Sequence, residues 1–130
     1  MIVVPDTSVW ISALEFGGIP DLAVVRALTE DQMAISDFIR AEIVRVLTGK
    51  FARDPVELDR QLDELLLHAI FVEVTGEVKG ICRDRNDNAI LETALKVQAD
   101  YLVAGDKDLL SLGKFGKTII VSPAVYLEFQ

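Results

Sequence analysis

Cysteine, basic residues and long apolar runs are all scarce in this sequence. The single cysteine, Cys82, cannot form an internal disulfide, which is typical of proteins from a reducing compartment. No apolar run approaches the ~18 residues of a membrane-spanning helix. No basic leader precedes the first apolar stretch, and Asp6 interrupts that stretch, so we expect no signal peptide. These absences favour a soluble cytoplasmic protein that does not bind a membrane.

Acidic residues outnumber basic ones, with 21 Asp and Glu against 13 Lys and Arg and a formal net charge of −8. A protein that binds nucleic acid through bulk electrostatics is normally basic, so this charge argues against a simple DNA-binding module. An enzyme whose carboxylates bind divalent cations is still compatible, because the ions reverse the local charge. The charge also suits a partner chain that supplies basic residues.

Apolar residues are plentiful, at 51% of 130 residues with a mean hydropathy of +0.34, which is enough for the core of a single domain over residues 1–130. Residue patterns predict strands at 2–5, 33–35, 70–74, 101–104 and 118–121. They predict helices at 9–14, 21–30, 37–48, 55–68, 86–97, 107–112 and 123–127. Strands that alternate with helices predict a three-layer α/β/α sandwich around a mostly parallel sheet of about five strands.

Two of the predicted strands run directly into an aspartate. Asp6 follows the first strand, and Asp106 follows the strand at 101–104 after Gly105. Ligands of open α/β sheets bind beyond the carboxyl ends of the strands, so both acids are candidate site residues. Asp106 could instead cap the helix at 107–112, and Asp108 could serve the same first turn.

Two helical acids lie at the edge of an apolar face. Helix geometry places Glu42 about 40° from Val46 and about 60° from Ile39, at the border of the apolar stripe. The alternative is a surface glutamate or an ion pair with Arg45. Asp87 precedes apolar residues of the helix at 86–97, but the segment from Asp84 to Asp87 also resembles a helix capping box.

Taken together, Asp6, Glu42, Asp87 and Asp106 can meet at one edge of the sheet. Four neighbouring carboxylates would repel one another by a few kcal/mol per pair, even at an effective dielectric constant of about 20. Oxygen ligands without histidine or cysteine companions are typical of Mg²⁺ or Mn²⁺ sites. We therefore predict a divalent-metal site at this edge.

Four segments give the chain a resemblance to PIN domains, the metal-dependent nucleases of VapC-type toxins and many RNA-processing endonucleases. They are VPDTSV at residues 4–9, AEIVRVL at 41–47, DRNDNAILETA at 84–94 and YLVAGDKDLL at 101–110. Their order and spacing match the family from residue 2 to about 127. The resemblance assigns catalytic and metal-binding roles to Asp6, Glu42, Asp87 and Asp106, a supporting role to Ser8, and accessory roles to Asp84 and Asp108.

The activity implied by the resemblance is metal-dependent hydrolysis of RNA by the toxin of a toxin–antitoxin pair. Two Mg²⁺ or Mn²⁺ ions about 3.5–4 Å apart would bridge the scissile phosphate and leave 5′-phosphate and 3′-hydroxyl ends. A homodimer and an antitoxin partner are further expectations of the family. The basic residues nearest to the acids in sequence, which could hold flanking phosphates, are Arg40, Arg45, Arg83, Arg85 and Lys107.

Three other functions are compatible with parts of the sequence. One is a housekeeping RNA-processing nuclease, and another is a PIN-like interaction module without activity. The third is an aspartyl-phosphate phosphotransfer protein, with the nucleophile at the end of the first strand in phosphatases or after the third strand in receivers, where this chain has Thr75 and Gly76. Haloacid-dehalogenase phosphatases require a second aspartate two residues after the first, where this chain has Ser8, and response-regulator receivers require adjacent acids there.

Overall fold

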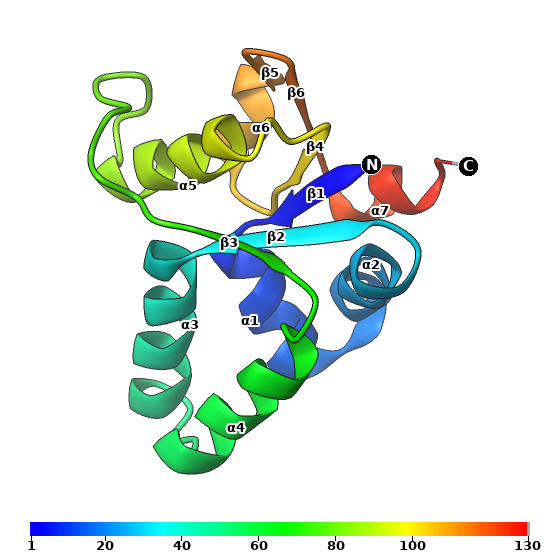
Figure 1. Cartoon of the computed structure of the whole chain (residues 1–130), viewed down its shortest axis with the longest axis vertical. Coiled ribbons are helices and arrows are strands. Elements are labelled where there is room, and N and C mark those ends of the chain that lie inside the picture. The colour runs from blue at the N-terminus through cyan, green and yellow to red at the C-terminus, as the bar shows by residue number, and fades with distance from the viewer. Residues whose placement is uncertain (130) are drawn as a thin grey trace.

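A six-stranded sheet forms the centre of the molecule in a computed structural model that describes residues 1–129 (Figure 1). The strands are β1 (Ile2–Pro5), β2 (Gln32–Ser36), β3 (Ile70–Val72), β4 (Tyr101–Val103), β5 (Lys114–Phe115) and β6 (Thr118–Val121). Their order across the sheet is β3-β2-β1-β4-β6-β5. Every pairing is parallel except that of β5 with β6.

Helices cover both faces of the sheet. They are α1 (Thr7–Phe16), α2 (Gly18–Thr29), α3 (Asp37–Gly49), α4 (Pro55–Leu65), α5 (Arg85–Lys96), α6 (Lys107–Leu112) and α7 (Pro123–Leu127). Figure 1 shows α1 to α4 on one side of the sheet and α5 and α6 on the other, while α7 packs beside α2. The predicted α/β/α sandwich with a mostly parallel sheet is therefore confirmed.

Several element boundaries differ from the predicted ones for local reasons. The sixth strand, β5, is a two-residue segment that turns back through Gly116, with φ 59°, to pair with β6; it is too short to have a periodic pattern. Helix α1 begins at Thr7, because Asp6 caps it by accepting a hydrogen bond from the Val9 amide. Helix α2 begins at Gly18, so that Pro20 lies in its first turn, where no amide donor is needed. Helix α4 ends at Leu65 and β3 ends at Val72, both before the predicted positions.

The core consists of apolar side chains from the central strands and from the helices on both faces. Val3 and Val4 of β1 and Leu102 and Val103 of β4 are fully buried, and Trp10 of α1 packs among the buried residues. These near-continuous apolar runs are typical of parallel strands that are covered on both faces. The two central strands are therefore rigid supports for whatever follows them in the chain.

No single helix within residues 1–129 is long and apolar enough to span a bilayer. Helices α1 and α2 meet that length and composition only as a pair, and the pair is bent by 112°.

The strand order reverses direction between β1 and β4. From β1 the chain continues to β2 and β3 on one side, and from β4 it continues to β6 on the other. Pro5 is in register with Val103, and the Asp6 amide donates to the Val103 carbonyl at 2.8 Å. Such a reversal leaves a crevice beyond the carboxyl ends of the two strands, which is where ligands of open α/β sheets bind.

Candidate active site

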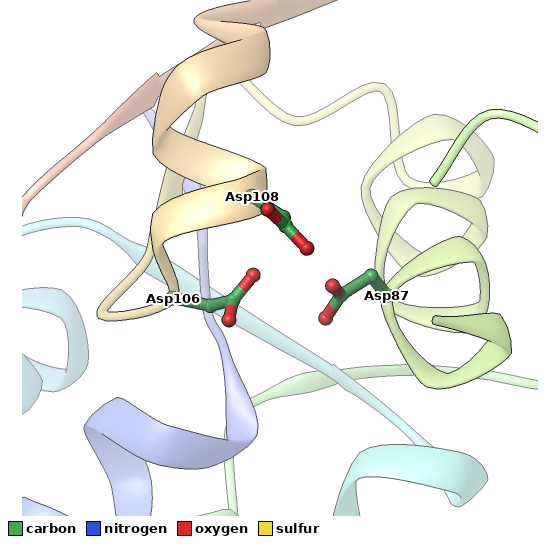
Figure 2. Close-up of side chains that lie close together, drawn as sticks. All are labelled: Asp87, Asp106 and Asp108. Carbon is green, nitrogen blue, oxygen red and sulfur yellow. The ribbon is translucent and has the colours of Figure 1, made fainter. Parts of the chain in front are cut away.

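Three aspartates converge beyond the carboxyl end of β4 (Figure 2). Asp87 projects from the first turn of α5, and Asp106 and Asp108 belong to the start of α6. Each offers a carboxylate oxygen, and these oxygens all lie within 4.8 Å of one another. Figure 2 shows the three side chains facing a common space between the two helix starts. We refer to Asp87, Asp106 and Asp108 as the aspartate cluster.

Helix capping fixes two of the acids at this edge and leaves Asp87 without a capping role. Asp106 caps α6, since its Oδ2 accepts a hydrogen bond from the Leu109 amide at 3.1 Å. Asp84 caps α5, since its Oδ1 accepts one from the Asn86 amide at 2.8 Å. The N-cap of α5 is therefore Asp84, and not Asp87 as the alternative interpretation of the sequence suggested. The carboxyl group of Asp87 is buried and does not cap the helix.

The aspartate cluster is electrostatically strained. Burial, followed by the charge of Asp106 and a hydrogen bond to it, raises the pKa of Asp87 to about 7, with smaller contributions from Asp84 and Asp108. Burial also raises the pKa of the Cys82 thiol, and the charges of the same four aspartates add to that rise. Cys82 therefore stays protonated near neutral pH and is unsuited to act as a thiolate nucleophile or ligand. A bound cation would relieve the repulsion among the carboxylates.

Asp6 lies beside the aspartate cluster as a buried, heavily hydrogen-bonded carboxyl, with only 1% of the residue exposed. Its Oδ1 accepts from Ser8 Oγ at 2.9 Å and from the Val9 amide at 2.8 Å, and its Oδ2 accepts from the Gly105 amide at 3.0 Å. Burial raises its pKa, although these donors and the Asp106 amide oppose the rise. A carboxylate has about four lone-pair positions, so these four donors leave Asp6 little free capacity for a further ligand.

Gly105 is required by the approach of β4 to the start of α1. A Cβ atom at this position would lie 2.8 Å from Ser8 Oγ, which is closer than such atoms come in proteins. The glycine thus allows its own amide to reach the Asp6 carboxylate. Through this contact β1 and β4 hold Asp6 and Asp106 next to each other.

Glu42 does not join the other acids. Its Oε2 accepts a hydrogen bond from Arg45 at 2.9 Å, which is the ion pair that the sequence left open as an alternative. Within residues 1–129, the group of neighbouring carboxylates contains neither Glu42 nor Asp6. In this structure Asp87 and Asp106 meet together with Asp108, while Glu42 is paired with Arg45, so the site role of Glu42 stays a prediction. Asp108 in turn is contacted by Arg83, whose Nη2 lies 3.0 and 3.1 Å from its two oxygens.

Comparison with known proteins identifies the family. The family model for the PIN domain matches residues 2–108. The chain belongs to the PIN domain family. No curated protein matches it.

Two solved structures share the fold of this PIN domain. One is the structure of VapBC2 from Rickettsia felis bound to a DNA fragment from the VapBC2 promoter. Its TM-score is 0.67 at 18% identity, and the match covers 94% of this chain and 98% of that one. VapC20 from Mycobacterium tuberculosis, a toxin that cleaves the sarcin–ricin loop, has a TM-score of 0.63 at 15% identity and covers 90% of this chain and 98% of that one. At these identities the likeness concerns the fold.

The donor atoms of the aspartate cluster fit a hard divalent cation. All three side chains offer carboxylate oxygens, which Mg²⁺ and Mn²⁺ prefer over softer ligands. Within the PIN domain, Asp87 and Asp106 could bind a cation directly, and Asp108 could do so after releasing Arg83. Because burial and its neighbours' charges raise the pKa of Asp87, the site is better suited to three carboxylates and a cation than to three carboxylates alone.

Sequence reasoning missed Glu92, a fully buried acid on α5. Its carboxylate accepts hydrogen bonds from the amides of Thr75, Gly76, Glu77 and Val78, and it pairs with Lys96 at 3.2 Å. Glu92 thereby fixes the loop between β3 and α5, which carries Arg83 and Asp84. The only signal in the sequence is the four-residue spacing of Glu92 and Lys96, which is common on exposed helices.

Metal affinity should depend on pH through Asp87. Without a cation, its carboxyl keeps a proton up to about pH 7, and a cation must displace that proton. We expect the affinity for Mn²⁺ to fall about tenfold for each pH unit below about 7 and to level off above it. Calorimetric titration in buffers of different ionisation enthalpy should show release of about one proton at pH 6 and almost none at pH 8. Equal affinities at the two pH values would contradict this coupling.

Proposed function

We propose that this PIN domain is a cytoplasmic, divalent-metal-dependent endoribonuclease and the toxin component of a type II toxin–antitoxin pair. The observation that carries the proposal is the aspartate cluster, in which Asp87, Asp106 and Asp108 meet beside the buried Asp6. Membership of the PIN family and the fold shared with a toxin that cleaves the sarcin–ricin loop support the same activity.

In RNA hydrolysis the metal ions and the acidic residues of the chain would have different roles. Mg²⁺ or Mn²⁺, most simply as two ions, would lower the pKa of an attacking water and stabilise the departing 3′-oxygen. Asp106 and Asp87 would hold the cations, and Asp6 would position the turn that carries Asp106, to which its carboxylate is bound through the Gly105 amide. Direct binding of a cation by Asp6 stays a prediction. Glu42 would have to leave Arg45 to take part, and its catalytic role stays a prediction.

Phosphate binding would fall to the basic residues that remain free. Among the five candidates from the sequence, Arg40 is paired with Asp59 and Asp63, Arg45 with Glu42, and Arg83 with Asp108. Arg85 and Lys107 form no ion pair within residues 1–129. Both adjoin the aspartate cluster in sequence, so they are our choice for contacts to RNA phosphates next to the scissile bond.

Partner binding is supported by exposed apolar side chains. Phe16, Ile19, Leu22 and Val25 of α1 and α2 are 46–73% exposed, although such residues are normally buried. A surface of this kind suits a second copy of the chain or an antitoxin. We expect a homodimer in solution and a complex with the product of a small adjacent open reading frame. A monomer that captures no such product would favour the housekeeping RNA-processing alternative.

The phosphotransfer alternative is disfavoured by the surroundings of Asp6. A nucleophilic carboxylate must reach its substrate, whereas Asp6 is buried and three of its lone-pair positions are taken by donors. The residue two positions later, Ser8, is one of those donors.

The activity can be tested with a labelled single-stranded RNA and purified protein. We expect cleavage in Mn²⁺ or Mg²⁺ that leaves 5′-phosphate and 3′-hydroxyl ends and that stops when EDTA removes the metal. Cleavage that persists in EDTA would contradict metal dependence. If no RNA is cut, and Mn²⁺ does not raise the melting temperature, the chain is an inert PIN-like module.

A further inference from the structure

A partly open pocket lies on the side of α5 that faces away from Asp87. It has a volume of about 400 Å³ and is bounded by the loop between β3 and α5, which Figure 1 shows beside the start of that helix. At ~100° per residue, Arg85 and Ala89, which line the pocket, lie about 160° around the helix axis from Asp87. A helix with its side chains is about 10–12 Å across, so an RNA strand that passes over the start of α5 could contact both the pocket and the aspartate cluster.

The lining combines apolar walls with cations. Val74, Val78 and Ala89 supply apolar surface, and Lys79 and Arg85 supply positive charge. Neither cation forms an ion pair with any residue from 1 to 129, although most basic residues of this acidic chain do. Two unpaired cations beside an apolar hollow are complementary to a ligand that has a flat apolar part and an anionic part.

The acidic residue that lines the pocket, Glu92, has its negative charge compensated by its own partners. Glu92 is fully buried, and its charge is satisfied by four loop amides and by Lys96. These bonds also hold the loop in place, so the pocket exists before a ligand binds. Its volume lies within the range of about 300–1,000 Å³ that is usual for small-molecule sites.

We propose that this pocket binds one unpaired nucleobase of the RNA substrate, with Lys79 and Arg85 holding the phosphate attached to it. The inference rests on the proposed ribonuclease function and deepens it by adding a subsite for a nucleotide that flanks the scissile bond. Single-stranded RNA is recognised through bases that leave the stack, and a guanidinium can bind a phosphate or stack on a base. The pocket would therefore select which nucleotide lies next to the cut.

Direct binding can be measured without RNA cleavage. Methyl NMR of the full chain, titrated with each of the four ribonucleoside 5′-monophosphates, should show shifts at Val74, Val78 and Ala89. The double variant Lys79→Gln/Arg85→Gln should weaken this binding roughly tenfold. A matched control, Lys50→Gln/Lys114→Gln, removes two lysines that form no ion pair in the described part of the chain and should leave the binding unchanged. If millimolar nucleotide shifts none of these methyls, the pocket is not a nucleotide site.

Cleavage kinetics separate failure of the subsite from failure of the ribonuclease proposal. We expect Lys79→Gln/Arg85→Gln to raise KM roughly tenfold. The slope of the logarithm of the RNA-binding constant against the logarithm of salt concentration should become less steep by about 0.7 for each phosphate that the variant no longer binds. Ala89→Leu, which fills the pocket, should change the base preference beside the cut, whereas Ala41→Leu on the exposed part of α3 should not. RNA cleavage that is unaffected by both pocket variants would overturn the subsite and leave the function standing. Nucleotide binding in a chain that cuts no RNA would overturn the ribonuclease proposal, and with it the role of the pocket as an RNA subsite, but would leave a nucleotide-binding pocket. Binding of an acidic peptide without nucleotide binding would also overturn the subsite.

Discussion

Asp87→Asn should abolish RNA cleavage and at the same time stabilise the metal-free protein. The substitution removes a carboxylate ligand from the aspartate cluster but leaves the cap of α5, which Asp84 provides. A bound metal stabilises the transition state of cleavage by several kcal/mol, and losing this stabilisation corresponds to a decrease in cleavage rate of roughly 10³-fold or more. The change in rate is measured with labelled RNA in Mn²⁺, and the change in stability by thermal unfolding in EDTA.

The sign of the stability effect follows from the raised pKa of Asp87. A carboxyl whose pKa is higher in the folded state stabilises the fold at low pH, and that contribution is lost as the pH rises to about 7. Above this pH the metal-free protein contains a charged carboxylate that Asp106 repels, and Asn removes that charge. The variant should therefore melt at a higher temperature than the parent at pH 8, and the difference should shrink as the pH falls towards 5.

A suitable control is Asp21→Asn, which removes one charge from the first turn of α2, away from the aspartate cluster. This variant should keep full activity and show no gain in stability, because an acid in that turn is favoured by the helix dipole. Cleavage by Asp87→Asn at the parent rate would exclude Asp87 from the active site. A lower melting temperature than that of the parent at pH 8 would show that the aspartate cluster is not strained.

The topology could be predicted because it depends on patterns that are local in the sequence. Alternating strands and helices lead to a parallel sheet, and two strands that end in Asp6 and Asp106 must then present both acids at one edge. The two-residue strand β5 could not be predicted, since only its pairing with β6 defines it. The predicted helix also begins later than α1, at residue 9 instead of Thr7. Asp6, which the sequence indicates as a site residue, serves in the structure as the N-cap of this helix as well.

Which acidic residues form the cluster was harder to predict than the edge of the sheet at which the cluster lies. A helical wheel places Glu42 at the edge of an apolar face, but it cannot show whether α3 lies close enough to α6 for contact. The nearby Arg45, one turn later, provided a partner at shorter range. The family resemblance gives Asp108 only an accessory role, because the roles of such acids vary within the family, and an acid in a first turn can also be explained by the helix dipole. Its convergence with Asp87 depends on how α5 and α6 pack, and no pattern in the sequence records that packing.

Glu92→Gln should destabilise the protein by about 3 kcal/mol at neutral pH. Burial is the largest single influence on the pKa of Glu92 and acts to raise it, but hydrogen bonds from the loop amides and from Lys96 lower that pKa from 4.5 to about 2. Each pKa unit corresponds to about 1.36 kcal/mol of preference for the charged form in the folded state. Glutamine has no charge and turns an amide group towards donors, so it cannot replace these interactions. Urea unfolding followed by circular dichroism measures the difference.

The pH dependence separates this role of Glu92 from a general packing defect. Because its pKa is lowered in the folded state, the stabilisation is complete above about pH 4.5 and is lost as the pH falls towards 2. The parent and Glu92→Gln should thus converge in stability at low pH, whereas a packing defect would persist there. Glu77→Gln changes an exposed acid of the same loop and should cost much less. Hydrogen exchange at the amides of residues 75–78 should accelerate in Glu92→Gln alone, and unchanged exchange there would show that the loop does not depend on this carboxylate.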